Sequence, residues 1–430
     1  MGSHPWNWLG LAIWALAVTL QVAGTVLSLK RMRLSSGRAG RVLPSTGPAG
    51  RVLPSGTPPS TDGLPPVTIL KPLKGVDDGL ELNLESFFRQ SYPEYELIFS
   101  VKDRWDPAAA VVRDLMRRYP HVPARLFTGA PDVGVNPKVC NLVKGYARAK
   151  YDVVLVSDSN TRAEPGFLAS LARELNSDGT GVVTAVFSGR GARGLGGRME
   201  ALALETFYTR GTFVADSLGE ACVTGKAMMF RRSDADRFGG MAALADYLAE
   251  DFVLGKRMEE IGRRVRVAST PVLQHLGDFS VVDYWKRQLR WGRIRKCHGP
   301  GVFAVEVLLL GALVSGLIGA ASLESLISFP LAPFMALHLS VWALCDGMMV
   351  HRLHGRVEAT VPTAWLTREL LAPALWLAIA CGSTVEWRGQ KLRLLRGGRV
   401  EGAGDEQQHD QDPAPVSVGG GYQQSSGRGR

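Results

Sequence analysis

The feature that most constrains this sequence is its pair of strongly apolar zones, residues 9–29 and 302–385, on either side of a less apolar middle. In the first zone Gln21 is the only strongly polar side chain, and the zone is long enough for a helix to cross a bilayer. Basic residues follow it at once: Lys30, Arg31 and Arg33. A signal peptide has the opposite order, with its positive charge first. We therefore expect an uncleaved anchor with residue 30 in the cytoplasm.

The second apolar zone divides into several pieces. Residues 302–323 and 326–350 are each long enough to span a bilayer. The third apolar run, 370–384, is shorter, and the basic segment 387–396 follows it. Two spans already return the chain to the cytoplasm near residue 351, and the basic segment also belongs on that side. We therefore expect the third piece to be a re-entrant or interfacial helix.

Composition divides the whole chain into segments. After the first apolar zone Gly, Pro, Ser and Arg dominate and GRVLPS occurs twice, which indicates a flexible tether. The end of the chain is similarly poor in apolar residues, which indicates disorder. The expected segments are an N-terminal transmembrane anchor at 1–33, a flexible linker at 34–65, a folded domain at 66–300, a transmembrane or re-entrant region at 301–396 and a disordered tail at 397–430.

Within the folded domain, short β-rich runs alternate with amphipathic segments. The expected strands are 67–70, 95–101, 152–158, 181–187 and 226–230. The expected helices are 80–90, 107–119, 138–149, 165–175, 199–214 and 244–260. This alternation predicts an α/β fold with a mostly parallel sheet. Ligands of such a sheet bind at the carboxyl ends of its strands.

Charge and cysteine usage narrow the class of partner. A net charge of +10 suits nucleic acid, an anionic membrane surface or a phosphorylated ligand. Many basic residues gather just before the second apolar zone: Lys286, Arg287, Arg290, Arg293, Arg295 and Lys296. That position favours lipid headgroups over nucleic acid. The five cysteines lie far apart without CxxC spacing, so nothing suggests a disulfide scaffold or a zinc site.

Three acids have positions that suit a nucleotide-sugar donor. Asp103 and Asp158 each end an expected strand, and Asp251 lies in an amphipathic segment. Such a donor needs an acid for its base or ribose, a divalent metal on its diphosphate and a general base for the acceptor hydroxyl. Asp158-Ser159-Asn160 resembles a DxD motif for Mg²⁺ or Mn²⁺, in which Asn160 would bind through its carbonyl. The alternative is that each acid caps a turn.

Two further motifs have competing interpretations. On a helix, Arg287, Arg290 and Trp291 share a face, which would present two guanidiniums to a diphosphate and an indole to a sugar or lipid. The alternative is a basic interfacial helix anchored by tryptophans. A GxGxxG sequence at 189–194 suggests dinucleotide binding, but the segment after it looks helical and lacks the expected acidic strand. We interpret it as chance or as a flexible acceptor loop.

The order Asp103, Asp158, Asp251 and RxxRW resembles the family two glycosyltransferases of GT-A fold, and most closely the ceramide glucosyltransferases. The similarity covers about residues 64–400. The matching stretches are LKPLKGVD (70–77), ESFFRQSYPEYEL (85–97), ARLFTG (124–129), GVNPKVCNLVKGYARAKYD (134–152), CVTG (222–225), AEDF (249–252) and WRGQKLRL (387–394). The resemblance implies a GT-A catalytic domain at 66–300 with N-terminal and C-terminal transmembrane helices.

The resemblance also implies a role for each matched residue. Asp251 would be the general base, and Asp158 with Asn160 would hold Mg²⁺ or Mn²⁺. The donor-binding residues would be Lys71, Asp103, Lys138, Asp158, Arg287 and Arg290, with Asp103 at the uracil or ribose. The acceptor-binding residues would be Trp291 and Cys222. The enzyme would be a multi-pass protein of the cell membrane with a cytoplasmic catalytic domain, acting in sphingolipid metabolism.

The implied reaction is an inverting transfer of glucose from UDP-glucose to ceramide, giving β-glucosylceramide. Two departures stand out: position 160 is commonly Gly or Asp in the family, and eukaryotic members have a His before CVTG that residues 207–221 lack. Alternatives are a hopanoid-linked type that glycosylates a phospholipid, and another UDP-sugar on ceramide. From other classes, a membrane-tethered oxidoreductase and a noncatalytic scaffold also stay open.

Overall fold

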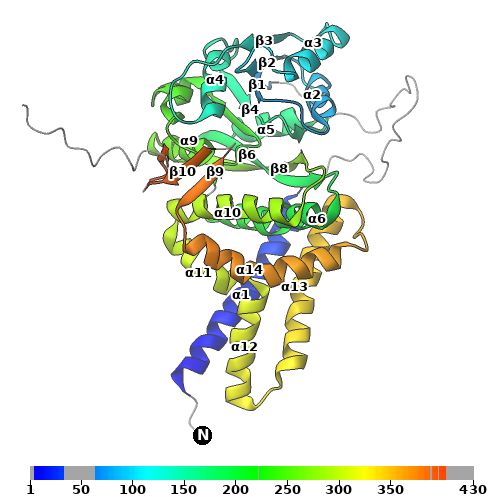
Figure 1. Cartoon of the computed structure of the whole chain (residues 1–430), viewed down its shortest axis with the longest axis vertical. Coiled ribbons are helices and arrows are strands. Elements are labelled where there is room, and N and C mark those ends of the chain that lie inside the picture. The colour runs from blue at the N-terminus through cyan, green and yellow to red at the C-terminus, as the bar shows by residue number, and fades with distance from the viewer. Residues whose placement is uncertain (1–3, 33–62, 221, 388–389, 396, 403–430) are drawn as a thin grey trace, which may run out of the picture.

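The computed structural model describes residues 4–32, 63–220, 222–387, 390–395 and 397–402. An α/β domain lies at one end, long helices project from the other, and a layer of helices lies across the junction between them (Figure 1). Most of the predicted linker and most of the predicted tail lie outside the described residues.

In the described residues eight strands form one mixed sheet in the order β3-β2-β1-β4-β7-β6-β8-β5. The strands are β1 (Val67–Leu73), β2 (Tyr95–Val101), β3 (Ala124–Thr128), β4 (Val153–Val156), β5 (Thr161–Arg162), β6 (Thr180–Arg190), β7 (Met228–Arg231) and β8 (Arg264–His275). The first four are parallel, whereas β7 runs antiparallel to both β4 and β6. The predicted α/β fold is confirmed, although the sheet is mixed and therefore less parallel than predicted.

Helices cover both faces of this sheet. They are α2 (Leu80–Phe88), α3 (Ala108–Arg118), α4 (Pro137–Ala147), α5 (Phe167–Leu175), α8 (Arg232–Asp236), the 3₁₀ helix η2 (Gly240–Leu244) and α9 (Glu250–Glu260). On β1, Ile69 belongs to one buried cluster and Leu70 to another, and both are at most 1% exposed. Strands that are buried on both faces are apolar throughout, which explains why VTIL lacks alternation.

The predicted helix 199–214 consists of three consecutive pieces. These are α6 (Gly194–Leu202), the π-helix η1 (Ala203–Tyr208) and α7 (Thr209–Ser217). The Thr209 hydroxyl donates to the Leu204 carbonyl five residues earlier at 2.8 Å, which matches the wider turn of a π-helix. The predicted helix 244–260 begins later, at Glu250.

The glycines of the GxGxxG sequence have structural roles at the β6–α6 connection. A Cβ at Gly191, where φ is +63°, would lie 2.5 Å from the His275 ring, and one at Gly189 would lie 2.8 Å from Ala201. The next strand of the sheet in sequence, β7, runs antiparallel to β6, so the connection is not the parallel crossover of a dinucleotide-binding unit. The glycines are therefore explained by close packing and a turn.

Three long helices project from the α/β domain: α1 (Pro5–Arg31), α12 (Ala312–Ile327) and α13 (Leu331–His354). Among the described residues, α1 and α13 are each long and apolar enough to cross a membrane, and the bent pair of α11 (Pro300–Leu310) and α12 is a third candidate. The predicted span at 302–323 falls on this bent pair, in which residues 300–307 and α12 meet at an angle of 61°. Gly311 between them has extended backbone angles.

The remaining C-terminal elements lie across the junction. Helix α14 (Val361–Ala380), where a re-entrant or interfacial helix is predicted, packs on α10 (Val281–His298) and is not among the candidate spans of the described residues. It begins nine residues before the predicted run at 370. Beyond it a small sheet contains β9 (Thr384–Trp387), β10 (Gln390–Leu394) and β11 (Val400–Gly402). The predicted disorder from 397 is therefore wrong for residues 397–402, which pair with β10 and bridge to Tyr247.

Candidate active site

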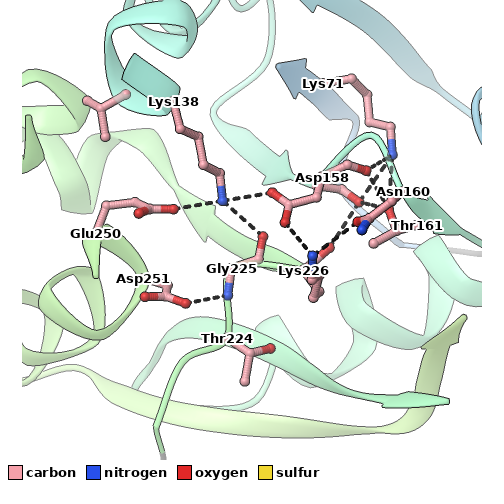
Figure 2. A network of polar contacts seen from close by, with 12 residues as sticks. Lys71, Lys138, Asp158, Asn160, Thr161, Thr224, Gly225, Lys226, Glu250 and Asp251 are labelled. Carbon is pink, nitrogen blue, oxygen red and sulfur yellow. Dashed lines mark hydrogen bonds and ion pairs between the residues drawn. The ribbon is translucent and has the colours of Figure 1, made fainter. Parts of the chain in front are cut away.

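A network of charged side chains lies at the carboxyl edge of β4, as Figure 2 shows. Asp158 follows β4 by two residues, and the Ser157 N–H donates to the Leu70 carbonyl at 3.0 Å, which ties this loop to β1. The Asp158 carboxylate accepts from two lysines, Lys138 at one oxygen and Lys226 at the other, each at 2.8 Å. Burial by itself would raise the pKa of Asp158, but the two ammonium groups hold the pKa well below its usual value.

Lys138 connects the β4 loop to helix α9. It lies in the first turn of α4, where the Asn136 side chain accepts from its backbone N–H at 2.9 Å. Its ammonium contacts Asp158, Glu250 at 2.7 Å and the Gly225 carbonyl at 3.2 Å. Burial alone would lower the pKa of Lys138, but the charges of the two acids outweigh burial and raise it. Lys138 is therefore a fixed positive charge at the centre of the network.

Asp251, the predicted base, lies at the second residue of α9 on the other side of this network (Figure 2). Its two carboxylate oxygens accept from the backbone N–H groups of Gly225 at 2.6 Å and Phe252 at 2.8 Å. Burial, followed by the charge of Glu250, raises the pKa of Asp251 to about 6. A carboxylate with a pKa near neutral pH is well suited to general-base catalysis.

Lys71 binds the backbone of the loop that carries Asp158. It is fully buried, and its ammonium donates to the Asp158 backbone carbonyl at 2.7 Å and to Thr161 Oγ1 at 3.1 Å. The ammonium also lies 3.6 Å from the centre of the Phe87 ring. In this arrangement the fully buried Lys71 holds the loop that carries Asp158.

The predicted metal ligands, Asp158 and Asn160, already share a cation. Lys226 Nζ lies 2.8 Å from Asp158 Oδ2 and 3.0 Å from Asn160 Oδ1. No cluster of three or more His, Cys, Asp or Glu side chains that could hold a metal occurs in the described residues. Mg²⁺, however, commonly binds through one or two protein oxygens together with substrate phosphates. The two side chains therefore fit a divalent ion that would take the place of the Lys226 ammonium.

Asp103 lies at the same edge of the sheet but outside this network. It follows β2, is exposed, and accepts from the Trp105 backbone N–H at 2.9 Å in a turn. Because β1 lies between β2 and β4, the ends of those two strands are about 10 Å apart. That separation is comparable to the extent of a nucleoside diphosphate.

Helix α10 carries the RxxRW residues, and a capping box between Ser280 and Asp283 fixes its start. The Arg287 guanidinium lies 2.9 Å from Glu200 and 4.5 Å from the centre of the Trp291 ring. Burial lowers the pKa of Lys226, and the charge of Arg287 also contributes to this lowering, so α10 lies near the network. Arg290 is half-buried on the same helix.

Trp291 and Cys222, the predicted acceptor residues, belong to different elements: Trp291 to α10 and Cys222 to the segment before β7. Trp291 packs edge-on against Tyr208 of η1, with ring centres 5.2 Å apart. Cys222 is exposed, yet surrounding protein raises the pKa of its thiol to about 12, with a further increase from Asp251 and a decrease from Arg295.

Sequence reasoning missed two members of the network, Lys226 and Glu250. Lys226 is the first residue of the apolar run KAMMF. A single lysine directly before a buried strand could have indicated a charged site at that end of the strand. Glu250 is adjacent to Asp251, and a pair of acids at a helix start could have suggested coupled carboxylates. Neither signal shows which side chains Lys226 and Glu250 contact in the folded protein.

Comparison with known proteins shows which sequence family the chain matches. The sequence profile of glycosyl transferase family 21 matches residues 18–400. Ceramide glucosyltransferase 1 of Caenorhabditis elegans is 33% identical over 343 residues, covering 78% of this chain and 73% of the relative. Ceramide glucosyltransferase of Komagataella phaffii is 28% identical over 431 residues, covering 78% and 83%.

Among solved structures, the mannosyltransferase PcManGT of Pyrobaculum calidifontis in complex with GDP-Man and Mn²⁺ is similar over 86% of this chain and 97% of that chain, with 18% identity and a TM-score of 0.45. The family assignment rests on the sequence matches, which extend over the α/β domain, the crossing helices and the projecting helices. The chain therefore belongs to glycosyl transferase family 21, and it is a glycosyltransferase.

Proposed function

We propose that this glycosyltransferase transfers glucose from UDP-glucose to ceramide with inversion at the anomeric carbon, giving β-glucosylceramide. The observation that carries the proposal is Asp251, a carboxylate with a pKa of about 6 beside a network of two lysines and an ionised Asp158. The curated relatives named above are ceramide glucosyltransferases, which supports ceramide as the acceptor and glucose as the sugar.

In this proposal the donor diphosphate binds at the carboxyl edge of β4. Lys138 and Lys226 supply positive charge there, with Arg287 and Arg290 on α10 closing from the other side. Asp103 contacts the uracil or ribose, and Lys71 positions the Asp158 loop. Mg²⁺ or Mn²⁺ held by Asp158 and Asn160 would supply further charge neutralisation for the leaving UDP.

Asp251 acts on the acceptor. Its carboxylate takes the proton from the primary hydroxyl of ceramide while the oxygen attacks the anomeric carbon of glucose. The bond between that carbon and the diphosphate oxygen breaks, and UDP leaves on the opposite face with the bonding electrons. The α-linked donor therefore gives a β-linked product, and one proton passes to Asp251. Cys222 and Trp291 would line the path of the acceptor.

The same proposal places the protein in the cell membrane as a multi-pass protein with a cytoplasmic catalytic domain. The last turn of α1 is basic, with Lys30 and Arg31, at the end that faces the α/β domain. The turn between α12 and α13 lies at the opposite end, together with the start of α1 (Figure 1). The basic end is the one that stays in the cytoplasm.

A product assay tests this function. The purified chain is offered ceramide, diacylglycerol and phosphatidylethanolamine, each with UDP-glucose, UDP-galactose, UDP-glucuronate and UDP-N-acetylglucosamine. We expect β-glucosylceramide, identified by mass spectrometry and by the anomeric coupling in NMR. Product on phosphatidylethanolamine alone would instead support the phospholipid-directed type, and an α-linked product would refute the inverting mechanism.

A further inference from the structure

A fully buried acid that the proposed mechanism does not use, Glu200, contacts the RxxRW helix. It lies on α6 and is 0% exposed. One of its carboxylate oxygens lies 2.9 Å from Arg287 Nε in an ion pair, and the other accepts from Gln288 Nε2 at 2.8 Å. One carboxylate on α6 therefore contacts two consecutive residues of the RxxRW segment on α10.

A second buried side chain, Gln274, holds the same guanidinium from the sheet. It is the next-to-last residue of β8, and its amide oxygen, turned toward the guanidinium, accepts from Arg287 Nη1 at 3.1 Å and from Nη2 at 2.7 Å. On the same strand, Gln274 pairs with Thr161 of β5, and the His275 backbone N–H donates to the Asn160 carbonyl at 3.0 Å. The strand that holds Arg287 is therefore bonded directly to the β4–β5 loop, which carries the predicted metal ligands.

The two residues that Glu200 contacts also hold the Trp291 ring. The Arg287 guanidinium lies 4.5 Å from the centre of that ring, a distance typical of a cation–π contact. Gln288 accepts from the Tyr208 hydroxyl at 2.8 Å, and Tyr208 packs edge-on against Trp291 with ring centres 5.2 Å apart. Glu200 is thus connected to the indole along two routes, one through Arg287 and one through Gln288 and Tyr208.

The chemistry of these contacts explains why position 200 carries an acid. Both of its partners are N–H donors, and an ionised carboxylate is the side chain that only accepts hydrogen bonds. A buried ion pair is often no more stabilising than well-packed apolar residues of similar volume. A carboxylate at this fully buried position therefore points to control of orientation. We call the Glu200 carboxylate and the Gln274 amide oxygen, together, the arginine clamp.

We infer that Glu200 and Gln274 are positioning residues of this glycosyltransferase: the arginine clamp fixes Arg287 and, through it, Trp291. Neither Glu200 nor Gln274 touches a substrate in this inference, and both act through the RxxRW residues. The inference rests on the proposed use of a UDP-sugar and adds the side chains that set the geometry of RxxRW. Because one carboxylate fixes both the guanidinium and the indole, the donor side and the acceptor side of the site are set together.

Replacing Glu200 by Gln tests the clamp, because it keeps the size of the side chain but turns an NH₂ group toward one of the two donors. The change also removes a negative charge close to Arg287, which by electrostatics alone would tighten the binding of UDP. The clamp predicts the opposite sign. We expect calorimetry of the purified full-length protein with Mg²⁺ to show UDP binding about tenfold more weakly. A purely structural role would lower the melting temperature and leave the UDP affinity of the folded protein unchanged.

Glu358→Gln is the matched control. It makes the same chemical change at an exposed acid that pairs with Arg198, two residues before Glu200 on α6, and should leave the UDP affinity unchanged. Equal or tighter UDP binding in Glu200→Gln than in the control would overturn the inference and leave the proposed function standing. Wild-type protein that binds no UDP would overturn the proposed function, and the inference with it.

A double variant supplies a second test that does not depend on the folding of Glu200→Gln alone. Arg287→Gln leaves the buried Glu200 carboxylate without its cation, whereas Glu200→Gln/Arg287→Gln removes both charges and leaves two amides that can bond to each other. We therefore expect kcat, measured as UDP release at saturating UDP-glucose, to be higher in the double variant than in Arg287→Gln. Saturation removes the contribution of donor affinity. A kcat in the double variant that is equal to or lower than that of Arg287→Gln would show that the two residues act independently, and would overturn the inference.

Discussion

At the scale of single residues, the candidate site gives two nearby carboxylates, Asp158 and Asp251, different tendencies to bind a proton. Asp158 is ionised because Lys138 and Lys226 pair with its two oxygens, whereas burial and Glu250 raise the pKa of Asp251 to about 6. Two acids with separated pKa values are the usual sign of separate roles in one site. The donor side thus has a fixed negative charge, and the acceptor side has a group that can take up a proton.

Replacement of Asp251 by Asn should preserve the fold and remove the base. The amide keeps the shape of the carboxylate, so donor binding measured by calorimetry should persist while turnover falls by about a hundredfold or more. Glu260→Gln on the exposed end of the same helix is the control and should leave turnover unchanged. Near-normal turnover of Asp251→Asn would show that another group is the base.

The pH dependence of kcat/KM should reflect the same group. The base form of Asp251 is the ionised one, so activity should be constant above its pKa of about 6 and fall as pH decreases through it. The fall should approach tenfold per pH unit. Because the charge of Glu250 contributes to the high pKa of Asp251, Glu250→Gln should shift the acidic limb of the kcat/KM profile to lower pH. A limb that stays in place in Glu250→Gln would contradict the assignment.

Replacement of Lys226 by Met should strengthen metal binding. In wild type a divalent ion has to displace the ammonium that lies between Asp158 and Asn160. We expect Mn²⁺, followed by electron paramagnetic resonance with UDP present, to bind roughly tenfold more tightly to the variant, a change of about 1.4 kcal/mol. Lys150→Met, at an exposed lysine, is the control. Unchanged affinity would indicate that Lys226 itself serves the diphosphate as its cation.

At the scale of elements, helix α10 joins the α/β domain to the crossing helices, because Trp291 packs against the core of the domain while the helix contacts α14. One region of it carries Arg287 and Trp291 toward the α/β domain, and further along Arg295 pairs with Glu306 of α11 at 2.8 Å. Its crossing with α14 is close, because a Cβ at Gly292 would lie 2.2 Å from the buried Ile379 side chain. The position of the RxxRW residues therefore depends on a glycine that lets two helices approach.

Replacement of Gly292 by Val should separate α10 from α14. Overpacking of this kind costs about 1–3 kcal/mol, so we expect a lower melting temperature in thermal unfolding. Gly301→Val is the control, because a Cβ at Gly301 meets nothing within 4 Å. Shortening the opposing side chain in Gly292→Val/Ile379→Ala should recover part of the loss. No recovery would mean that the damage arises elsewhere.

At the scale of the whole molecule, one buried acid joins the α/β domain to the helical region. Asp346 of α13 accepts from Arg210 of α7 and from Arg368 and Trp365 of α14, at 2.7 Å and 3.0 Å for the last two. The Gln21 side chain of α1 also donates to it at 3.3 Å. Four helices from distant parts of the sequence therefore meet at a single carboxylate.

Replacement of Asp346 by Ala should destabilise the whole protein. The change leaves two buried arginines short of a partner, and breaking a buried ion pair typically costs about 3–5 kcal/mol. We expect a large fall in melting temperature in detergent, together with easier proteolytic separation of the α/β domain. Glu324→Ala removes an exposed acid from α12 and should change neither measurement. Equal stability of the two variants would show that the network around Asp346 contributes little.

Local signals account for what the sequence predicted well. The apolar segments predicted α1 and α13 because the length of a span is fixed by bilayer thickness. The strand ends predicted that Asp158 would lie at an edge of the sheet, because strands beside one another share that edge. The bend at Gly311 and the strands β9 and β11 were not predicted, since each depends on contacts with other elements.

The sequence by itself determined which segments are apolar, the α/β alternation and the candidate acids Asp158 and Asp251. Only the tertiary structure decided their partners. Lys226 reaches Asp158 from 68 residues away, and Gln21 reaches Asp346 from 325 residues away. The antiparallel β7 and the buried ion pair between Arg210 and Asp346 likewise depend on how distant elements pack. The physical reason is that burial and alternation leave periodic patterns along the chain, whereas a charge finds its partner only in space.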